Sequence, residues 1–317
     1  MEVLTADAIA RPGEDLHSVQ LACDFRVLRC LLIASRSWCC GKLCAVSRPS
    51  LKLGLLSAVN RLSSPLYWLY ERRLRSALQP GRLPRHIGVI MDGNRRFARR
   101  SEVDIKAGHD YGAAKAREFL DWCLELGIPH VTIWGFSSEN RGRDDSEVAH
   151  LHELFFRQAT ELLDDPRLYR HRVRVRIIGE IGDFPEHARQ ALRRIEEATA
   201  EHDGLNLNLA LGYGGREEIV NAVRSLLQKK DAEGASLAEV IDCLSAEEIG
   251  KHLYTAGLPD PDFVIRTSGE IRLSGFLLWQ TAYSEYYFCE AFWPEFRKVD
   301  FLRALRSFQA RERRFGR

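Results

Sequence analysis

Short apolar runs rich in Val, Ile and Leu alternate with longer amphipathic segments over residues 82–317 of this chain. Short apolar runs are typical of buried strands, whereas apolar residues recurring every three or four positions indicate helices. Alternation of the two predicts crossover connections, and crossovers produce a mostly parallel sheet with helices on its faces. We therefore expect a single α/β domain over residues 82–317, with a mostly parallel central sheet flanked by helices.

The expected elements can be placed along the chain by their composition and their end signals. Strands are expected at 87–91, 131–136, 173–178, 205–211 and 263–265, with further extended runs at 276–279 and 286–289. Helices are expected at 112–126, 146–163, 185–201, 216–230 and 301–313. Gly127 and Pro166 are typical of residues that follow a helix, and Pro185 is typical of a first helical turn.

The N-terminal part differs in composition from the rest. Residues 1–60 hold five of the eight cysteines and show no sustained periodicity, so we expect a poorly ordered extension. These cysteines lack the paired spacing of a zinc finger. Residues 61–81 have the spacing of an amphipathic helix that leads into the domain, and packing on the domain is favoured over a position on a membrane surface. Cys123, Cys243 and Cys289 are expected to be buried in a reducing compartment.

Bulk charge and hydropathy exclude several classes of protein. The formal net charge is only +2, so positive charge is not in the excess that nucleic-acid binding by electrostatics requires. No segment approaches the ~20 apolar residues of a membrane span, and no cleavable signal is recognisable. We expect a cytoplasmic protein that does not bind nucleic acid.

Polar residues with phosphate-binding chemistry follow the first expected strand. Ligands of α/β sheets collect at the carboxyl ends of strands, where a carboxylate can hold a divalent cation and arginines can hold phosphate oxygens. A surface turn with a helix cap is the alternative, but two successive arginines favour phosphate. The segment therefore predicts a site for Mg²⁺ and a diphosphate. Its candidate residues are Asp92, Gly93, Asn94, Arg95 and Arg96.

Two further polar clusters follow later strands. The second strand is followed by hydroxyls, an amide and arginines, which suit an anion although a capped loop is the commoner meaning of such a run. The third cluster could grip a second diphosphate through paired donors, with Glu285 as a further oxygen ligand for Mg²⁺. His109 lies near a helix start, where a lone histidine is usually structural. The neighbouring polar clusters make it a candidate ligand for a diphosphate. The candidates are Ser137, Ser138, Glu139, Asn140, Arg141 and Arg143 in the second cluster, and Arg266, Arg272 and Ser274 in the third.

Common nucleotide and prenyl-synthase motifs are missing from the sequence. There is no G-x-x-x-x-G-K-[ST] and no G-x-G-x-x-G after a strand, which disfavours a P-loop or a dinucleotide-binding protein. The DDxxD pattern of all-helical prenyl synthases is also missing. The sequence therefore offers two candidate anion sites and one or two carboxylates, and it has no nucleotide-binding motif.

Three segments together carry a family resemblance. Residues 91–98, 136–140 and 266–280 resemble the cis-prenyltransferase (undecaprenyl diphosphate synthase) family. The similarity covers about residues 84–317 and leaves at least the first sixty residues unmatched. It implies an α/β homodimer that uses Mg²⁺ to condense isopentenyl diphosphate onto an allylic diphosphate, geranyl or farnesyl, with formation of cis double bonds. The lipid product implies peripheral contact with a membrane.

The resemblance also assigns roles to individual residues. It implies that Asp92 binds Mg²⁺ and is catalytic, and that Asn140 stands at the position of the proton acceptor. Because an amide is a poor base, we expect Asn140 to position a proton that moves towards a diphosphate oxygen. Glu285 would be a metal ligand given from the partner side. The substrate-binding residues implied are Gly93, Asn94, Arg95, Arg96, Phe97, His109, Ser137, Ser138, Glu139, Arg141, Arg143, Arg266, Arg272, Leu273 and Ser274.

Departures from the family pattern bear on substrate grip and product length. Arg95 replaces a common glycine, Ile105 a common arginine, and Arg141 a common tryptophan. Gly135 is small, as in long-chain members, so medium- or long-chain products are slightly favoured. Other segments resemble an actinobacterial branch with short-chain Z-farnesyl diphosphate synthases, which is the alternative. A non-catalytic subunit of a heteromeric enzyme is disfavoured because Asp92 and the site serines are present.

Overall fold

The computed structural model describes residues 67–311, so the expectation for residues 1–60 lies outside the described part of the chain. Six strands form one sheet in the order β3-β4-β2-β1-β5-β6, and every neighbouring pair is parallel. The predicted parallel α/β sheet is confirmed. The strands are β1 (His86–Ile90), β2 (His130–Ser137), β3 (Arg174–Ile178), β4 (Asn206–Tyr213), β5 (Phe263–Arg266) and β6 (Glu285–Phe288).

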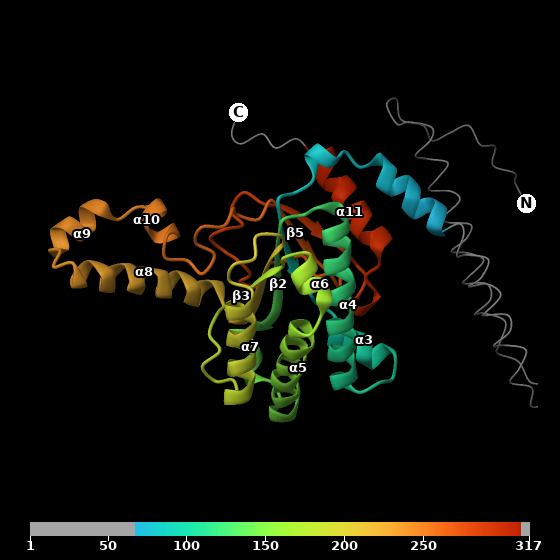
Figure 1. The fold of residues 1–317 in the computed structure, drawn as a ribbon, viewed down its shortest axis with the longest axis horizontal. Helices are drawn as coiled ribbons and strands as arrows, with labels where there is room; N and C mark the ends of the chain where they lie inside the picture. The colour runs from blue at the N-terminus through green and yellow to red at the C-terminus, as the bar shows by residue number, and fades with distance from the viewer. Residues whose placement is uncertain (1–66, 312–317) are drawn as a thin grey trace, which may run out of the picture. The chain divides into compact units, whose positions relative to one another are not determined.

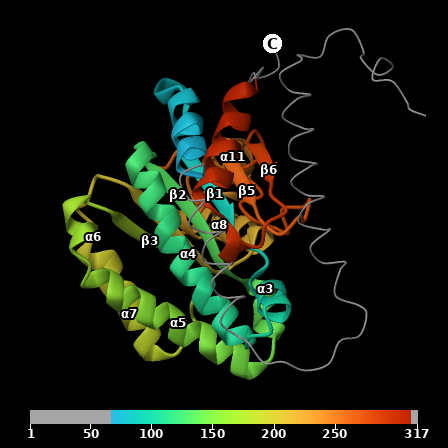
Figure 2. The same ribbon diagram turned by 90° about the vertical axis from the view of Figure 1, so that its right-hand side faces the viewer.

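Helices cover the sheet and extend beyond it (Figures 1 and 2). Helices α4, α5 and α7 lie side by side, whereas α8 projects away from the sheet with α9 and α10 returning beside it. The helices are α3 (Asn94–Arg100), α4 (Ile105–Leu126), α5 (Asp145–Leu163), α6 (Pro166–Arg170), α7 (Glu186–Ala198), α8 (Gly215–Ala232), α9 (Leu237–Cys243), α10 (Ala246–Gly250) and α11 (Lys298–Ala310). Three 3₁₀ turns are η1 (Pro80–Arg82), η2 (Ser138–Gly142) and η3 (Trp293–Glu295).

The central strands are buried on both faces, as their continuous apolar runs predict. All five residues of β1 are buried. The register pairs Ile90 at the end of β1 with Trp134 of β2 on one side and with Arg266 of β5 on the other. The carboxyl ends of three strands therefore meet at one edge of the sheet, and the segments that follow them lie together there.

Several predicted boundaries differ from the structure. Helix α4 begins at Ile105 rather than at 112, because Asp104 caps it by accepting a hydrogen bond from the backbone N–H of Lys106 at 2.7 Å. The short helix α3 was not predicted. The extended run expected at 276–279 is wrong: these residues form turns, and Leu277 has a φ of 44° that a strand does not allow.

The helix at residues 67–77 packs beside α11. Leu74 is buried, Glu71 lies 3.2 Å from the Lys298 ammonium, and Arg303 donates to the Tyr70 hydroxyl at 3.1 Å. None of the described helices is long and apolar enough to cross a membrane. Of the three described cysteines, Cys123 is buried as expected, whereas Cys243 and Cys289 are only half-buried.

Candidate active site

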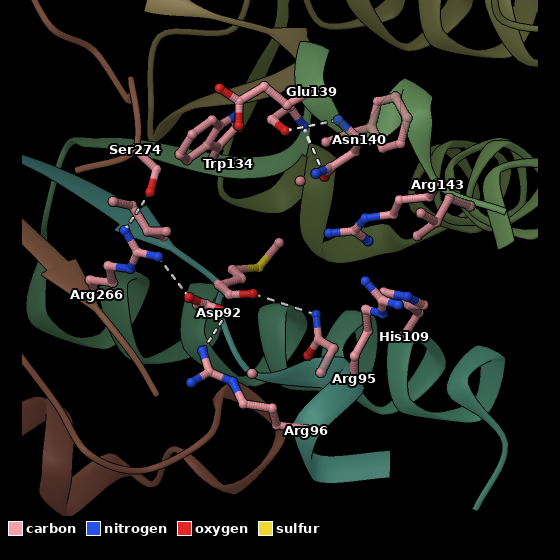
Figure 3. A pocket seen from close by; sticks show the side chains of 18 of the residues that line it. Asp92, Arg95, Arg96, His109, Trp134, Glu139, Asn140, Arg143, Arg266 and Ser274 are labelled. Atoms are coloured by element: carbon pink, nitrogen blue, oxygen red, sulfur yellow. Dashed lines mark hydrogen bonds and ion pairs between the residues drawn. The ribbon is translucent and has the colours of Figure 1, made fainter. Parts of the chain in front are cut away.

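A pocket of about 370 Å³ lies where the carboxyl ends of β1, β2 and β5 meet. The side chains that line it come from segments far apart in the sequence and point into one space (Figure 3). The pocket thus brings together most of the candidates of all three polar clusters. The candidates that line it are Asp92, Gly93, Asn94, Arg95, Arg96, His109, Ser137, Glu139, Asn140, Arg143, Arg266 and Ser274.

Asp92 joins the first and third clusters. One carboxylate oxygen accepts a hydrogen bond of 2.8 Å from Nη2 of Arg266, and the other lies 3.2 Å from Nη2 of Arg96. The Arg266 side chain is only 5% exposed, and its Nη1 also donates to the Ser274 hydroxyl at 2.9 Å. Charge-assisted pairs of this kind fix both partners in position. Asp92 therefore holds the guanidinium that orients Ser274.

The turn after β1 sends the two successive arginines to opposite sides of the pocket. Gly93 has a φ of 106°, and a Cβ there would lie 3.0 Å from Phe292 and from Ser268, so glycine is required. Helix α3 then begins, and neighbouring residues on a helix diverge. Arg96 turns back towards Asp92 (Figure 3). Arg95 instead faces Glu147, whose carboxylate lies 3.6 Å from its Nε.

Glu147 is the centre of a cluster that sequence reasoning missed. Its buried carboxylate accepts hydrogen bonds from Nε2 of His109 at 3.0 Å and from Nη1 of Arg143 at 2.9 Å. Burial would raise the pKa of Glu147, but the His109 hydrogen bond and the charges of Arg143 and Arg95 outweigh it and hold the pKa below its usual value. The spacing of Arg143 and Glu147, four residues apart at a helix start, was the signal available in the sequence.

His109 is fixed in a defined tautomer by this cluster. Burial lowers the pKa of His109 below its usual value, and the Glu147 carboxylate only partly opposes this. The ring is therefore neutral near pH 7. Because a carboxylate only accepts, the Nε2 that faces Glu147 carries the proton. Nδ1 is then the unprotonated nitrogen of the ring and can accept a hydrogen bond.

Asn140 has one end of its amide engaged by the backbone. Ser137 Oγ accepts from the Asn140 N–H, and Asn140 Oδ1 accepts from the Ser137 N–H, both at 3.2 Å. This reciprocal capping box opens η2 directly after β2. Within residues 67–311 no partner takes the amide N–H₂ of Asn140, so the side chain presents donors to the pocket rather than an acceptor.

Three of the candidates lie beside the pocket rather than in it. The Phe97 ring packs edge-on against Tyr111, with 5.7 Å between ring centroids. Ser138 lines a neighbouring cavity of about 360 Å³, which also reaches Ser274. Leu273 packs against a small buried apolar cluster behind the pocket.

Three charged candidates are paired elsewhere. Arg141 turns outwards and forms an ion pair of 2.7 Å with Asp183. Arg272 is 61% exposed and pairs with Glu270. Glu285, at the start of β6, pairs with Arg311 at 2.6 Å. Within one chain, these three residues do not reach the pocket.

The structure adds pocket residues that the motifs did not single out. Trp134 of β2 lines the pocket and stacks on Phe276 at 5.3 Å between ring centroids, and its buried Nε1 has no partner among the described residues. Arg99, one turn after Arg95 and Arg96, adds a further positive charge. Trp134 lies inside a strand, where a large apolar side chain is ordinary, so the sequence carried no signal for it.

A second cavity, of about 140 Å³ and almost wholly apolar, adjoins the polar pocket. Helices α4 and α5 form its walls, and β2 and β4 form its floor. The two spaces adjoin, because they share a set of lining residues. These are Met91, Asn94, His109, Gly135 and Leu151.

The polar pocket has the donor set for a magnesium ion that arrives with a phosphate ligand. Its carboxylates are Asp92 and Glu139. The described residues contain no group of three or more His, Cys, Asp or Glu that would form a complete metal cage. Mg²⁺ is commonly held by one or two carboxylates together with substrate phosphates and water. The residues present fit that mode of binding.

Together these features define a class of protein: one that holds an anionic headgroup among arginines at a sheet edge and an apolar tail between two helices. A family model described as "Putative undecaprenyl diphosphate synthase" matches residues 90–316. An isoprenyl transferase of Thermus thermophilus is 58% identical over 256 residues, which cover 81% of this chain and 97% of the relative. A (2Z,6E)-farnesyl diphosphate synthase of Thermobifida fusca is 51% identical over 256 residues, covering 80% of this chain and 98% of the relative.

Solved structures agree with this. Lavandulyl diphosphate synthase from Lavandula x intermedia, in complex with dimethylallyl diphosphate, matches with a TM-score of 0.68 and 32% identity, covering 75% of this chain and all of that one. A probable undecaprenyl diphosphate synthase from Campylobacter jejuni matches with a TM-score of 0.60 and 32% identity, covering 74% and 99%. The chain belongs to the undecaprenyl diphosphate synthase family of cis-prenyltransferases and is an enzyme that transfers prenyl groups.

Proposed function

We propose that this protein condenses isopentenyl diphosphate with an allylic diphosphate, geranyl or farnesyl, and forms a cis double bond at each step. The observation that carries the proposal is that the arginine-lined pocket and the apolar cavity lie side by side. A diphosphate needs charge-assisted donors, and a growing prenyl chain needs an apolar space. The two spaces meet at residues that line both.

The allylic diphosphate is assigned to the side of the pocket formed by α3 and the start of α4. Arg95 and Arg96 flank this side, and the turn that supplies them requires glycine at position 93. When the allylic C–O bond breaks, negative charge builds on the leaving diphosphate, and fixed guanidinium groups stabilise that charge. Nδ1 of His109 donates to a phosphate oxygen only in the doubly protonated ring, so binding of the anion favours protonation of His109.

Isopentenyl diphosphate is assigned to the side held by Arg266 and Ser274. Arg272, which pairs with Glu270 outside the pocket, would have to turn inwards to join them. The double bond of isopentenyl diphosphate attacks the allylic carbon, and a proton then leaves the new chain. Asn140 presents N–H donors to the pocket, so it orients a diphosphate oxygen that takes this proton rather than taking the proton itself. Asn140→Asp tests this role: full activity of that variant would exclude it.

Mg²⁺ is the proposed cofactor, with Asp92 as its protein ligand. When bound, it would neutralise negative charge on the diphosphate. Arg266 and Arg96 hold the Asp92 carboxylate at the edge of the pocket through contacts of 2.8 and 3.2 Å.

A homodimer is the proposed assembly. The α8–α9 arm carries apolar side chains that no described residue covers: Leu237 is 74% exposed and Ile241 63% exposed. A second copy of the chain would bury such a face. Glu285 would then act from the partner side, as the family resemblance implies. The lipid product supports a cytoplasmic enzyme in peripheral contact with a membrane.

Two product lengths are compatible with the proposed reaction, and different observations favour each. The small residue at Gly135 favours a medium- or long-chain Z-polyprenyl diphosphate. The volume of the apolar cavity, about 140 Å³, favours the alternative, a short-chain product such as Z-farnesyl diphosphate. A Cβ on Gly135 would lie 3.1 Å from Leu211 and 3.2 Å from Phe155, so neighbouring side chains already occupy the room that the glycine leaves. We adopt the short-chain alternative.

A second candidate function, from a different class of protein, is that of a non-catalytic subunit in a heteromeric enzyme. Such a subunit has no use for an ordered polar pocket. Arg266 donates hydrogen bonds to both Asp92 and Ser274 at the sheet edge, and this ordered arrangement favours catalysis.

The proposal is tested with purified full-length protein, Mg²⁺ and radiolabelled isopentenyl diphosphate, with geranyl or farnesyl diphosphate as primer. Label is expected in a Z-configured prenyl diphosphate, resolved by length after dephosphorylation. Asp92→Asn is expected to abolish incorporation while leaving the fold intact by circular dichroism. No incorporation with either primer would defeat the proposal.

A further inference from the structure

Glu270 joins the two sides of the polar pocket from outside it. Its Oε1 accepts a hydrogen bond of 2.7 Å from Nη1 of Arg96, and its Oε2 pairs with the guanidinium of Arg272. Arg96 stands on the proposed allylic side, whereas Arg272 belongs to the cluster assigned to isopentenyl diphosphate. Glu270 itself does not line the pocket. One carboxylate therefore holds an arginine from each proposed substrate site.

The two contacts of Glu270 complete a closed ring of charged groups. Arg96 also lies 3.2 Å from Asp92, and Asp92 accepts a hydrogen bond of 2.8 Å from Arg266. Nη1 of Arg266 donates to the backbone carbonyl of Arg272, the residue whose side chain Glu270 holds. Each member of the ring thus contacts two others. A ligand that draws Arg96 out of the ring therefore disturbs the contacts that hold Arg272.

Residues 270–273 form a short loop with few backbone contacts. The backbone has a positive φ on either side of it, 72° at Gly269 and 51° at Ser274. Among the described residues, none accepts a hydrogen bond from the backbone N–H groups of 270–273. The side-chain contacts of the loop therefore decide where the Arg272 guanidinium lies, and its partner there is Glu270.

A diphosphate and the Glu270 carboxylate compete for the same donors, because both are anions that accept charge-assisted hydrogen bonds from a guanidinium. The hydrogen bond from Arg96 holds the pKa of Glu270 below its usual value, so this carboxylate is ionised at neutral pH. A diphosphate that takes Nη1 of Arg96 leaves Glu270 with Arg272 alone, whose side chain is 61% exposed. Because an exposed pair of this kind contributes little, Arg272 is then free to turn to a second diphosphate.

Building on the proposed function, we propose that Glu270 is a positioning residue that couples the two substrate sites. While it bridges Arg96 and Arg272, it keeps Arg272 turned away from the pocket. Binding of the allylic diphosphate to Arg96 releases the bridge, and Arg272 then turns inwards to bind isopentenyl diphosphate. By thermodynamic linkage the coupling is reciprocal, so each diphosphate raises the affinity for the other by the same factor.

The chain supplies a matched control for this bridge. Glu295, in η3, pairs with Arg100, which lies one turn beyond Arg96 in α3. The side chains of Arg100 and Glu295 are 56% and 38% exposed, against 41% and 25% for Arg96 and Glu270. Neither Glu295 nor Arg100 lines the pocket. Glu295→Gln thus removes a carboxylate that contacts the same helix without touching either substrate site.

The experiment measures, by calorimetry with Mg²⁺, the Kd of full-length protein for isopentenyl diphosphate with and without a thio analogue of geranyl diphosphate. Sulfur replaces the oxygen on the allylic carbon of this analogue, so that the bond does not ionise readily. In the unmodified protein the analogue is expected to lower the Kd about tenfold, an ordinary coupling between sites. Partly exposed ion pairs contribute little to stability, so the variants are expected to fold.

The variants separate the bridge from its charge. Glu270→Gln is neutral, and Glu270→Asp is too short to span both arginines, so in each the analogue is expected to change the Kd by less than about twofold. Glu295→Gln is expected to keep the full change. Incorporation of labelled isopentenyl diphosphate by the unmodified protein, measured in parallel, reports on the transferase function itself.

Each contrary result has a distinct meaning. A Kd of the unmodified protein that the analogue does not change would overturn the coupling, and so would a Glu270→Gln protein in which both affinities fall while their ratio persists. Persistence of the ratio in Glu270→Asp would also overturn it, because charge alone would then suffice, as would its loss in Glu295→Gln. All of these results leave the transferase function standing if label is incorporated. No incorporation by the unmodified protein would remove the proposed function, and the coupling with it.

Discussion

Neutralising Glu147 gives the sharpest test of how the allylic side of the pocket is organised. In the Glu147→Gln variant one acceptor oxygen replaces two, and an N–H₂ group replaces the oxygen that faces Arg95. His109 and Arg143, which now donate to the same carboxylate oxygen at 3.0 and 2.9 Å, would compete for a neutral acceptor. We therefore expect both side chains and Arg95 to lose their fixed positions.

The expected magnitude follows from these contacts. Replacing a charged by a neutral partner costs about 1 kcal/mol per hydrogen bond, so the two bonds of Glu147 give about 2 kcal/mol. The contact with Arg95 adds little, because that guanidinium is 42% exposed and screened by solvent. Misplaced substrate-binding groups reduce rates by about 100-fold for a shift near 1 Å. We expect kcat/KM for the allylic diphosphate to fall by roughly ten- to a hundredfold.

Initial rates of isopentenyl diphosphate incorporation at varied allylic diphosphate measure this change, and thermal unfolding measures the loss of stability. Glu153→Gln, on the exposed face of the same helix, is the control. Among the described residues Glu153 pairs with His187 at 3.2 Å, and it lines neither the polar pocket nor the apolar cavity. Unchanged kcat/KM in Glu147→Gln would refute the reasoning. An equal fall in Glu153→Gln would do the same.

Three further predictions follow from single contacts. Gly112→Ala would place a Cβ 2.5 Å from Oδ1 of Asn94, so we expect unfolding free energy to fall by about 1–3 kcal/mol and KM for the allylic diphosphate to rise; unchanged denaturant midpoint and KM would contradict this. Arg266→Lys cannot bridge Asp92 and Ser274 at once, so KM for isopentenyl diphosphate should rise at least tenfold in steady-state assays, and an unchanged KM would exclude the bridging role. Burial lowers the pKa of His86 to about 4, so stability is fully present above pH 6.5 and is lost as pH falls towards 4, by about 3 kcal/mol in all. Urea titrations across that range should show this loss and should show less of it in His86→Gln.

The alternation of strands and helices was predictable because each element carries its own signal. The buried strands read as continuous apolar runs, and the long helices carry caps and stripes of apolar residues. The failures fall where tertiary contacts decide. At 276–279, Phe276 and Leu277 are fully buried, but in turns rather than in a strand, because Leu277 takes a positive φ. An apolar composition reports burial and does not report backbone conformation.

The site was predictable as a set of chemical types and less so as an arrangement. Asp92 and Arg266, 174 residues apart, were both expected at the carboxyl ends of strands of one parallel sheet, but only the structure shows that β1 and β5 are neighbours and bring the two together. Arg141 and Arg143 have the same chemistry and nearly the same position, yet one faces Asp183 and the other Glu147. That choice depends on the backbone of η2, and no local pattern in the sequence distinguishes the two.

One pair of helices carries both the ionic and the apolar half of the proposed reaction. His109, Ala113, Ala116 and Leu120 lie on one face of α4, since residues separated by three or four positions share a face. The first of them belongs to the charged cluster, and the other three line the apolar cavity, where the two alanines leave room for a prenyl chain. Because a helix is rigid, its rise per residue fixes how far each of these positions lies from the proposed diphosphate site. Side chains along this face of α4 can therefore change the room for the chain without altering the chemistry at the strand ends.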